Sequence, residues 1–213
     1  RVVIPREKGI KKMDYEAMEL FAGRRSIRQY RNEIVPHQLL LDLLKAATWA
    51  PSAHNRQPWR FAVIDQPRTK ERLAKAMGKK LRADRTADGV PEEIIESDVD
   101  RSFQRITGAP VVILVALTVE GMDSYPDQRR QNNEWLMAVQ SAAMAGQNLM
   151  LAAHANGLGS CWMCGPLFSP DVVRKTLNLP ADWQPQGLIV LGYAAEEPQK
   201  GRRPLAEVVR FVT

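Results

Sequence analysis

The segment Val111–Leu117 constrains the fold more than any other part of the chain. It reads VVILVAL, an unbroken apolar run. A strand with one solvated face alternates apolar and polar residues, whereas a strand covered on both faces reads as a continuous apolar run. A second run of this kind lies at 187–193. The chain is therefore expected to place helices on both faces of a central sheet.

Helical patterns alternate with these strands. Helices are expected at 14–23, 36–50, 68–77, 92–106, 134–156 and from Ser169 onward, a charged loop at 82–91, and a further strand at 59–65. The order helix, helix, strand occurs three times, which predicts an α+β fold with a mixed central sheet flanked by helices. The helix at 134–156 is apolar nearly all round and should be buried, with Gly157 as its cap. The sequence contains no internal repeat or linker, so residues 1–213 are expected to form a single domain.

Composition and charge narrow the class of protein. Apolar residues make up 45% and charged residues 25%, which is ordinary for a globular protein. The net charge of +6 suits anionic ligands such as phosphates. Nucleic acid is less favoured, because the densest basic cluster is short. No uncharged apolar run approaches the roughly 18 residues of a membrane span. The sparse cysteines and the absence of a signal-peptide pattern favour the cytoplasm.

Two basic clusters are candidate phosphate sites. The first lies at a helix-to-loop junction and consists of Arg24, Arg25, Ser26 and Arg28. Guanidinium groups match phosphate oxygens bidentately, although a solvated basic loop is the alternative interpretation. The second lies near the end of the sequence and consists of Lys200, Arg202 and Arg203. It suits either a second phosphate contact or a flexible basic tail, and composition does not separate these.

Two other clusters suit a flat ring. One occupies the loop between an expected helix and an expected strand, and consists of Pro51, Ser52, Ala53, Asn55 and Gln57. Its amide and hydroxyl groups suit the edge of a heteroaromatic ring, and an ordinary capped turn is the alternative. The other cluster is Gly159 and Ser160 within GLGSCW. Glycine lets the backbone approach a flat ligand closely, although a plain helix cap would also need it.

In this order, RRSIRQY, APSAHNRQPWRF, GLGSCW and GRRPLAEVV resemble the nitroreductase superfamily along essentially the whole chain. The resemblance implies an α+β homodimer that binds FMN at the subunit interface. The residues implied to hold the FMN phosphate and ribityl chain are Arg24, Ser26 and Arg28, completed by Lys200, Arg202 and Arg203. Those implied to line the ring are Pro51, Ser52, Ala53 and Asn55 of the other subunit, with Gly159 and Ser160 near N5 and O4.

A narrower likeness also exists. DGVPEEII, DSYPDQRR, GLGSCWMC and LNLPADWQPQG resemble the C-terminal domain of the gamma-glutamyl ligase that builds the deazaflavin coenzyme F-420. That domain uses FMN to reduce a dehydro precursor of the coenzyme. The sequence departs from it in two ways: it carries no ligase domain, and its NRQPW at 55–59 follows the general nitroreductase pattern.

The expected activity is hydride transfer from NAD(P)H through flavin N5 to a small organic acceptor, such as a nitroaromatic or a quinone, by a ping-pong mechanism. The alternatives are reduction of a dehydro precursor in F-420 synthesis, a non-catalytic flavin-binding or sensor module, and a basic interaction protein without cofactor. Cys161 and Cys164 form a CxxC, but no second ligand pair accompanies it, so no metal site is expected. His54 in the ring loop suits either substrate contact or a structural role.

Overall fold

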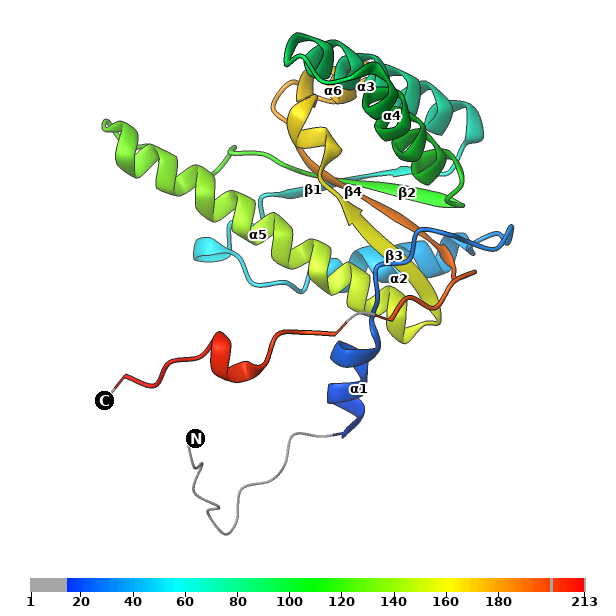
Figure 1. The fold of residues 1–213 in the computed structure, drawn as a ribbon. Coiled ribbons are helices and arrows are strands. Elements are labelled where there is room, and N and C mark those ends of the chain that lie inside the picture. The colour runs from blue at the N-terminus through cyan, green and yellow to red at the C-terminus, as the bar shows by residue number, and fades with distance from the viewer. Residues whose placement is uncertain (1–14, 200, 213) are drawn as a thin grey trace.

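The computed structural model describes residues 15–199 and 201–212, which are built around a four-stranded sheet (Figure 1). The strands are β1 (Trp59–Ile64), β2 (Val111–Leu117), β3 (Leu158–Met163) and β4 (Gln184–Tyr193), in the order β1-β2-β4-β3. All three neighbouring pairs are antiparallel, so the expectation of a mixed sheet was wrong for these strands. In general, a single crossover helix joins two parallel strands. In this protein, two successive helices lie between β1 and β2 and bring the chain back in the opposite direction.

The helices extend beyond several expected bounds. They are α1 (Tyr15–Gly23), α2 (His37–Ala47), α3 (Pro67–Ala87), α4 (Glu92–Thr107), α5 (Gln128–Ala155) and α6 (Pro170–Leu177), with short 3-10 turns η1 (Ala53–Asn55), η2 (Gly165–Phe168) and η3 (Leu205–Glu207). Most of the expected loop at 82–91 is helical, because its charges pair along and between the helices. Lys80 pairs with Asp84 at 2.5 Å, and Arg82 pairs with Glu96 of α4 at 2.6 Å.

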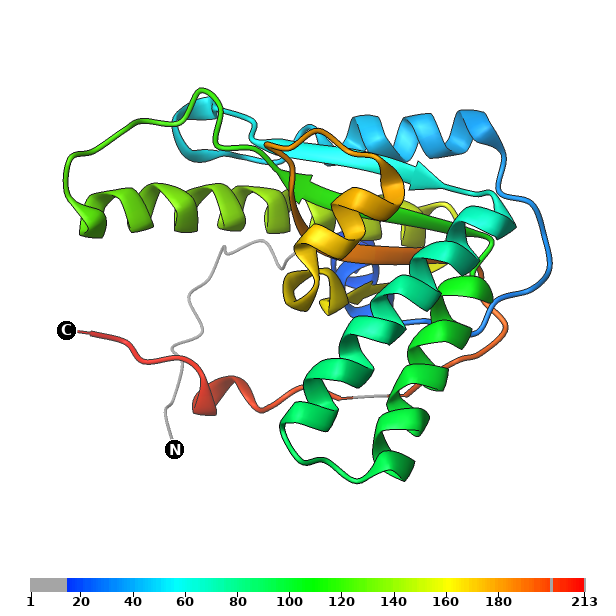
Figure 2. The ribbon, with the colours of Figure 1, turned by 90° about the horizontal axis from the view of Figure 1, so that it is seen from above.

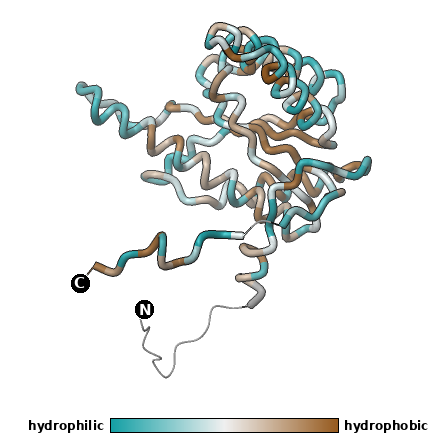
Figure 3. Tube along the Cα trace, in the orientation of Figure 1, coloured by the Kyte–Doolittle hydropathy of each residue, from teal (hydrophilic) through white to brown (hydrophobic). Residues whose placement is uncertain are grey.

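The alternating side chains of the strands divide the core between two faces. Val111, Ile113 and Val115 of β2 pack with α2 and α5, whereas Val112 and Leu114 pack with α3, α4 and α6. Figures 1 and 2 show these two helical layers on opposite sides of the sheet, and Figure 3 shows the strands as the most apolar part of the trace. The continuous apolar run of β2 is therefore explained by helices that cover both faces of the sheet, as the sequence indicated.

Helix α5 is buried on one face only. Ala138, Ala142 and Leu149 are fully covered, whereas Trp135 and Leu136 are 40% and 52% exposed. The helix begins at Gln128, earlier than expected, because the Asp127 carboxylate accepts a hydrogen bond from the backbone N–H of Arg130 at 3.0 Å. The expectation that this helix is buried all round was thus wrong for a single chain. Among the described residues, no helix is long and apolar enough to cross a membrane.

Strand β3 was not predicted from the sequence. Gly157 closes α5 in the left-handed region, with a φ of 74°, as its expected role as a cap requires. The strand begins at the next residue and forms one edge of the sheet. Gly159 and Ser160, which were expected to approach a flat ligand just past the helix, therefore lie on an edge strand.

Candidate functional site

The segment after α1 runs along the free edge of β3. The Ile27 N–H donates to the carbonyl of Ser160 at 3.0 Å, and the Arg31 N–H donates to the carbonyl of Tyr193 at 2.9 Å. The Tyr30 hydroxyl lies 2.5 Å and 3.0 Å from the carbonyl oxygens of Ile27 and Val190. Two clusters far apart in the sequence, RRSIR and GLGSCW, are brought together by these contacts.

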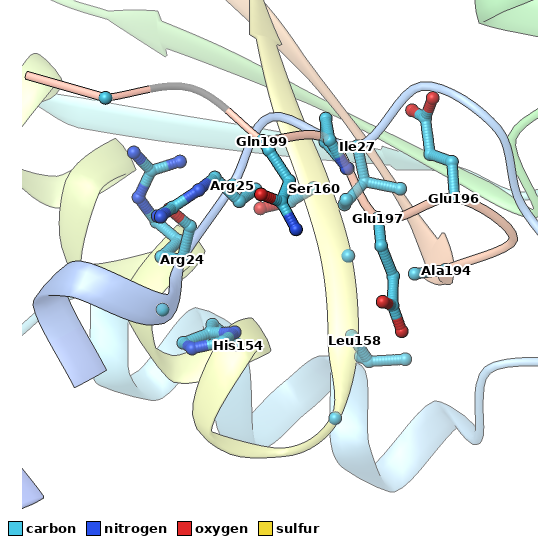
Figure 4. A pocket seen from close by; sticks show the side chains of 15 residues that line it. Arg24, Arg25, Ile27, His154, Leu158, Ser160, Ala194, Glu196, Glu197 and Gln199 are labelled. Atoms are coloured by element: carbon cyan, nitrogen blue, oxygen red, sulfur yellow. The ribbon is translucent and has the colours of Figure 1, made fainter. Parts of the chain in front are cut away.

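A pocket of about 820 Å³ opens where this segment meets β3 (Figure 4). It is hereafter called the first pocket. Among the residues that line it are Arg24, Arg25, His154, Gly159 and Ser160. Its remaining wall comes from 194–199 and Gly201, after β4. The pocket is therefore assembled from the end of α1, the end of α5, the start of β3 and the chain beyond β4.

Two arginines, Arg24 and Arg25, and two glutamates, Glu196 and Glu197, line the first pocket, and Arg202 lies close to Arg24. Burial lowers the pKa of Arg24, and the neighbouring charges of Arg202 and Arg25 lower it further. Among the ion pairs of the described residues, none includes these three arginines. Glu197 lies in the same pocket and is exposed. Closely spaced guanidinium groups of this kind favour a bound anion.

The segment at 24–28 packs closely against β3 at the first pocket. An added Cβ at Gly159 would lie 2.7 Å from Cβ of Ile27, so glycine is needed for the close approach of these two segments. The Ser160 hydroxyl is buried and has no hydrogen-bond partner among the described residues. A buried hydroxyl normally finds a partner, so a ligand oxygen is a reasonable occupant.

A second pocket, of about 630 Å³, lies where the end of β3 meets α3, α4 and η2. Arg101, Arg105, Cys161, Cys164 and Gly165 are among its lining residues. Burial lowers the pKa of Arg105, and the nearby charges of Arg28 and Arg101 lower it further. Arg28 is not among the lining residues of the second pocket, but its charge lies close enough to Arg105 to act on that pKa, whereas sequence reasoning grouped Arg28 with Arg24.

Two features of the second pocket suit a polar ring edge. Among the side-chain hydrogen bonds and ion pairs between described residues, none involves the Arg105 guanidinium. Among the loop and turn backbone hydrogen bonds of those residues, none uses the N–H of Cys164 or Gly165 as donor. Sequence reasoning missed Arg101 and Arg105. Their spacing of four residues on a helix, which places them on one face, was the signal that could have found them.

The loop at 51–57 does not line either pocket of this chain. The Ala53 N–H donates to the Ser141 hydroxyl at 3.3 Å, and the Gln57 N–H donates to the Ser52 hydroxyl at 3.1 Å. Asn55 and Gln57 have φ values of 53° and 51°, in the left-handed region. Non-glycine residues held in this way cluster at functional sites. Pro51, Ser52, Ala53, Asn55 and Gln57 are therefore fixed in shape but lie away from both basic clusters.

The C-terminal basic cluster is only partly described. Arg202 and Arg203 are both exposed, and Arg202 acts on the pKa of Arg24 and so lies near the first pocket. Lys200 lies outside the described residues. Cys161 is buried and Cys164 is exposed, and both are free thiols.

The antiparallel sheet between two helical layers is an α+β fold, and two pockets lined in part by arginine side chains lie along its edge strand β3. The Nitroreductase family matches residues 21–193, and the chain belongs to this family.

The chain is 33% identical over 211 residues to an NADH dehydrogenase of Thermus thermophilus, covering 87% of this chain and 91% of that protein. It is 32% identical over 204 residues to a candidate NADH dehydrogenase/NAD(P)H nitroreductase of Methanothermobacter thermautotrophicus, covering 95% and 87%. Its fold is similar to the crystal structure of a candidate nitroreductase from Desulfovibrio desulfuricans in complex with FMN, with a TM-score of 0.72 and 28% identity over 94% of this chain and 99% of that one.

Proposed function

We propose that residues 1–213 form a single-domain, FMN-dependent NAD(P)H oxidoreductase that passes hydride to a small organic acceptor by a ping-pong mechanism. The observation that carries the proposal is the placement of two arginine-lined pockets along β3, one lined by Arg24 and Arg25 and one by Arg101 and Arg105, with the charge of Arg28 close to Arg105. FMN has a phosphate at one end and a polar pyrimidine edge at the other, so it presents groups that suit both. The nicotinamide-linked names of two relatives and the FMN in the Desulfovibrio structure support the same conclusion.

The first pocket fits the phosphate end. Arg24 and Arg25 supply guanidinium groups, Arg202 adds charge, and the buried Ser160 hydroxyl lacks a partner among the described residues. Charge-assisted hydrogen bonds from guanidinium groups to phosphate oxygens are among the strongest in proteins. We assign Arg24, Arg25 and Ser26 to the phosphate, with Lys200, Arg202 and Arg203 as further contacts.

The second pocket fits the ring end. We assign Arg28 and Arg105 to the pyrimidine edge. The carbonyl of Ser160 already accepts the Ile27 N–H, so the backbone of Gly159 and Ser160 is partly engaged. We therefore propose the N–H groups of Cys164 and Gly165 as donors to the ring near N5 and O4, in place of Gly159 and Ser160.

The side chains have positioning and electrostatic roles. Bound FMN would supply the redox chemistry by accepting hydride at N5 and passing it on. Arg24 and Arg25 fix one end of the cofactor, so the position of the ring is set by the distance between the two pockets. Arg28 and Arg105 place positive charge at the pyrimidine edge, which favours the ring when it carries negative charge. Because donor and acceptor would use one open face in turn, ping-pong kinetics are expected.

We also propose that the active unit is a homodimer. Apolar side chains are exposed on α1 (Met18, Phe21), on α5 (Trp135, Leu136, Met144) and on the C-terminal segment (Leu205, Val208, Phe211). Exposed apolar surface on this scale marks an interaction site. The loop at 51–57 lies away from both pockets of its own chain, so Pro51, Ser52, Ala53, Asn55 and Gln57 could contribute to the partner's ring site across such an interface.

There are two candidates for the acceptor, a general class of small organic molecules and one specific precursor. The reported relatives have dehydrogenase and nitroreductase names, which favour a general acceptor such as a nitroaromatic or a quinone. The four segments that resemble the F-420 ligase domain favour the dehydro precursor of that coenzyme. Rates with a quinone, a nitroaromatic and the dehydro precursor, measured at equal enzyme concentration, distinguish the two.

Absorbance spectroscopy of the purified protein tests the proposal. We expect a yellow protein that releases FMN on denaturation and bleaches without oxygen when NADH or NADPH is added. A quinone added afterwards should restore the colour. FAD as the main released flavin would contradict the assignment. Bound FMN that neither nucleotide reduces would favour a sensor module, and a protein still colourless after incubation with FMN would favour an interaction protein.

A further inference from the structure

His154 is the one histidine among the residues that line the first pocket. It lies in the last turn of α5, where its ring packs against the end of α1. An added Cβ at Gly23 would lie 2.8 Å from Nε2 of His154, so the ring touches the backbone directly before Arg24. Figure 4 shows the His154 ring beside Arg24 and Arg25 in the pocket. The imidazole is therefore held in place and faces the space assigned to the phosphate.

We propose that His154 is a phosphate-binding residue of this pocket and that it takes up a proton from solvent when the phosphate binds. The inference rests on the proposed FMN function and adds a residue that the sequence clusters did not include. An imidazolium donates from both ring nitrogens, whereas a neutral imidazole donates from one only. A bound phosphate dianion beside the ring favours the imidazolium.

The charges around His154 explain why phosphate binding adds a proton to the imidazole. Burial, and then the charges of Arg24 and Arg25, hold the pKa of His154 below its ordinary value in the ligand-free pocket. The imidazole is therefore neutral near pH 7 before the ligand arrives. A phosphate dianion reverses the local field and raises the same pKa, so binding between the two pKa values adds a proton.

Other groups that face the pocket do not produce this uptake. The charged groups from the end of α1 are Arg24 and Arg25, and those from the C-terminal segment are Glu196, Glu197 and Arg202. The lining residues of β3 carry no charge. Arginine cannot be deprotonated in proteins, so the guanidinium groups take up no proton when the phosphate binds. The phosphate itself titrates near pH 6 and would release protons on entering a basic site, which is the opposite sign.

Calorimetry of FMN binding to the FMN-free protein, in buffers of different ionisation enthalpy, tests the proposal. At about pH 7.5 the parent should take up a measurable fraction of a proton, up to about one, per FMN bound. The variant His154→Gln keeps an amide donor but cannot be protonated, and its uptake should fall to near zero. Its FMN affinity near pH 6.5 should be roughly tenfold lower than that of the parent, with a smaller loss near pH 8.5.

The control is His37→Gln, which changes an exposed histidine at the start of α2. It should bind FMN with the proton uptake of the parent. Equal uptake in the parent and in His154→Gln, both with FMN bound, would overturn the inference and leave the proposed function standing. If neither the parent nor either variant binds FMN, the proposed function fails, and the inference fails with it.

Discussion

Arg24 and Arg28 lie four residues apart in the sequence, but they neighbour different charged groups. Arg24 lines the first pocket, and Arg202 and Arg25 act on its pKa. Arg28 acts on the pKa of Arg105 in the second. The backbone between them is extended along β3, so the residues are not brought to one face as they would be on a helix. The two arginines are therefore expected to recognise different parts of one ligand.

Replacing each of these arginines with alanine separates their roles. Arg24→Ala should weaken FMN binding roughly 10- to 150-fold, because it removes a charge-assisted hydrogen bond to phosphate. It should leave the weaker binding of riboflavin, which has no phosphate, almost unchanged. Arg28→Ala should weaken both ligands by a similar factor. Fluorescence titration with both flavins measures this, and an equal loss of riboflavin affinity in the two variants would contradict the separation.

Arg105→Gln should lower the reduction potential of bound FMN. The guanidinium at the pyrimidine edge favours the reduced ring, so its removal should shift the potential by about 20–60 mV, since 30 mV corresponds to about 1.4 kcal/mol for two electrons. Equilibration with a reference dye measures the shift. The matched control is Arg72→Gln, which changes an exposed arginine of α3 that is not among the lining residues of the second pocket. A potential equal to that of the parent would remove Arg105 from the ring site.

At the scale of elements, β3 lines both pockets, and it is also the strand that was not predicted from the sequence. The strands β2 and β4 were predicted because they are buried on both faces and read as apolar runs. β3 begins with Leu158, Gly159 and Ser160, directly after a helix cap, and glycine and serine are poor signals for a strand. Its place at the sheet edge depends on contacts with β4 and with 24–31, which are remote in sequence.

Gly159→Ala should damage the site through packing. The new Cβ would lie 2.7 Å from Cβ of Ile27 and 2.8 Å from both of its γ carbons, so the segment at 24–28 must move away from β3. We expect a loss of about 1–3 kcal/mol in stability and a weaker affinity for FMN. Denaturant unfolding with and without FMN measures both.

The double variant Ile27→Ala with Gly159→Ala tests the cause. Ile27→Ala removes the two γ carbons from the contact, so the double variant should lose less than the sum of the single losses. Strictly additive losses would mean that the contact between Gly159 and Ile27 is not the cause of the lost stability.

For the whole molecule, the helical layers and some of the residues that line the first pocket could be predicted from the sequence, but the residues of the second pocket could not. Arg24, Arg25, Gly159 and Ser160 were predicted, and the structure places all four around one pocket. Arg101 and Arg105 were missed because on a charged helix they resemble a solvated face. The proposed role of the loop at 51–57 requires a second chain, and no pattern within one sequence determines how two copies pack.

Mixing two inactive variants tests whether sites are shared between subunits. One variant carries Arg24→Ala with Arg28→Ala, and the other carries Ser52→Ala with Asn55→Ala. If each FMN contacts both subunits, a heterodimer has one site with both defects and one intact site, as two-fold symmetry requires. Co-expressed, differently tagged chains should therefore regain roughly half of the parent activity per dimer. Purified heterodimers that remain inactive would contradict sharing, as would a fully active monomer.

The first pocket draws its walls from three stretches of the sequence, at 23–27, at 154–160, and at 194–199 with Gly201. During synthesis on the ribosome, the last of these stretches emerges after all four strands of the sheet. A nascent chain therefore cannot complete the proposed anion site until those strands are available to fold. A ligand bound there would link stretches that lie far apart in the sequence and would favour the folded state by mass action. Proteolysis near Gln199 and Gly201 should then be slower with ligand than without it, so protection of these residues would report how much of a protein pool has been loaded.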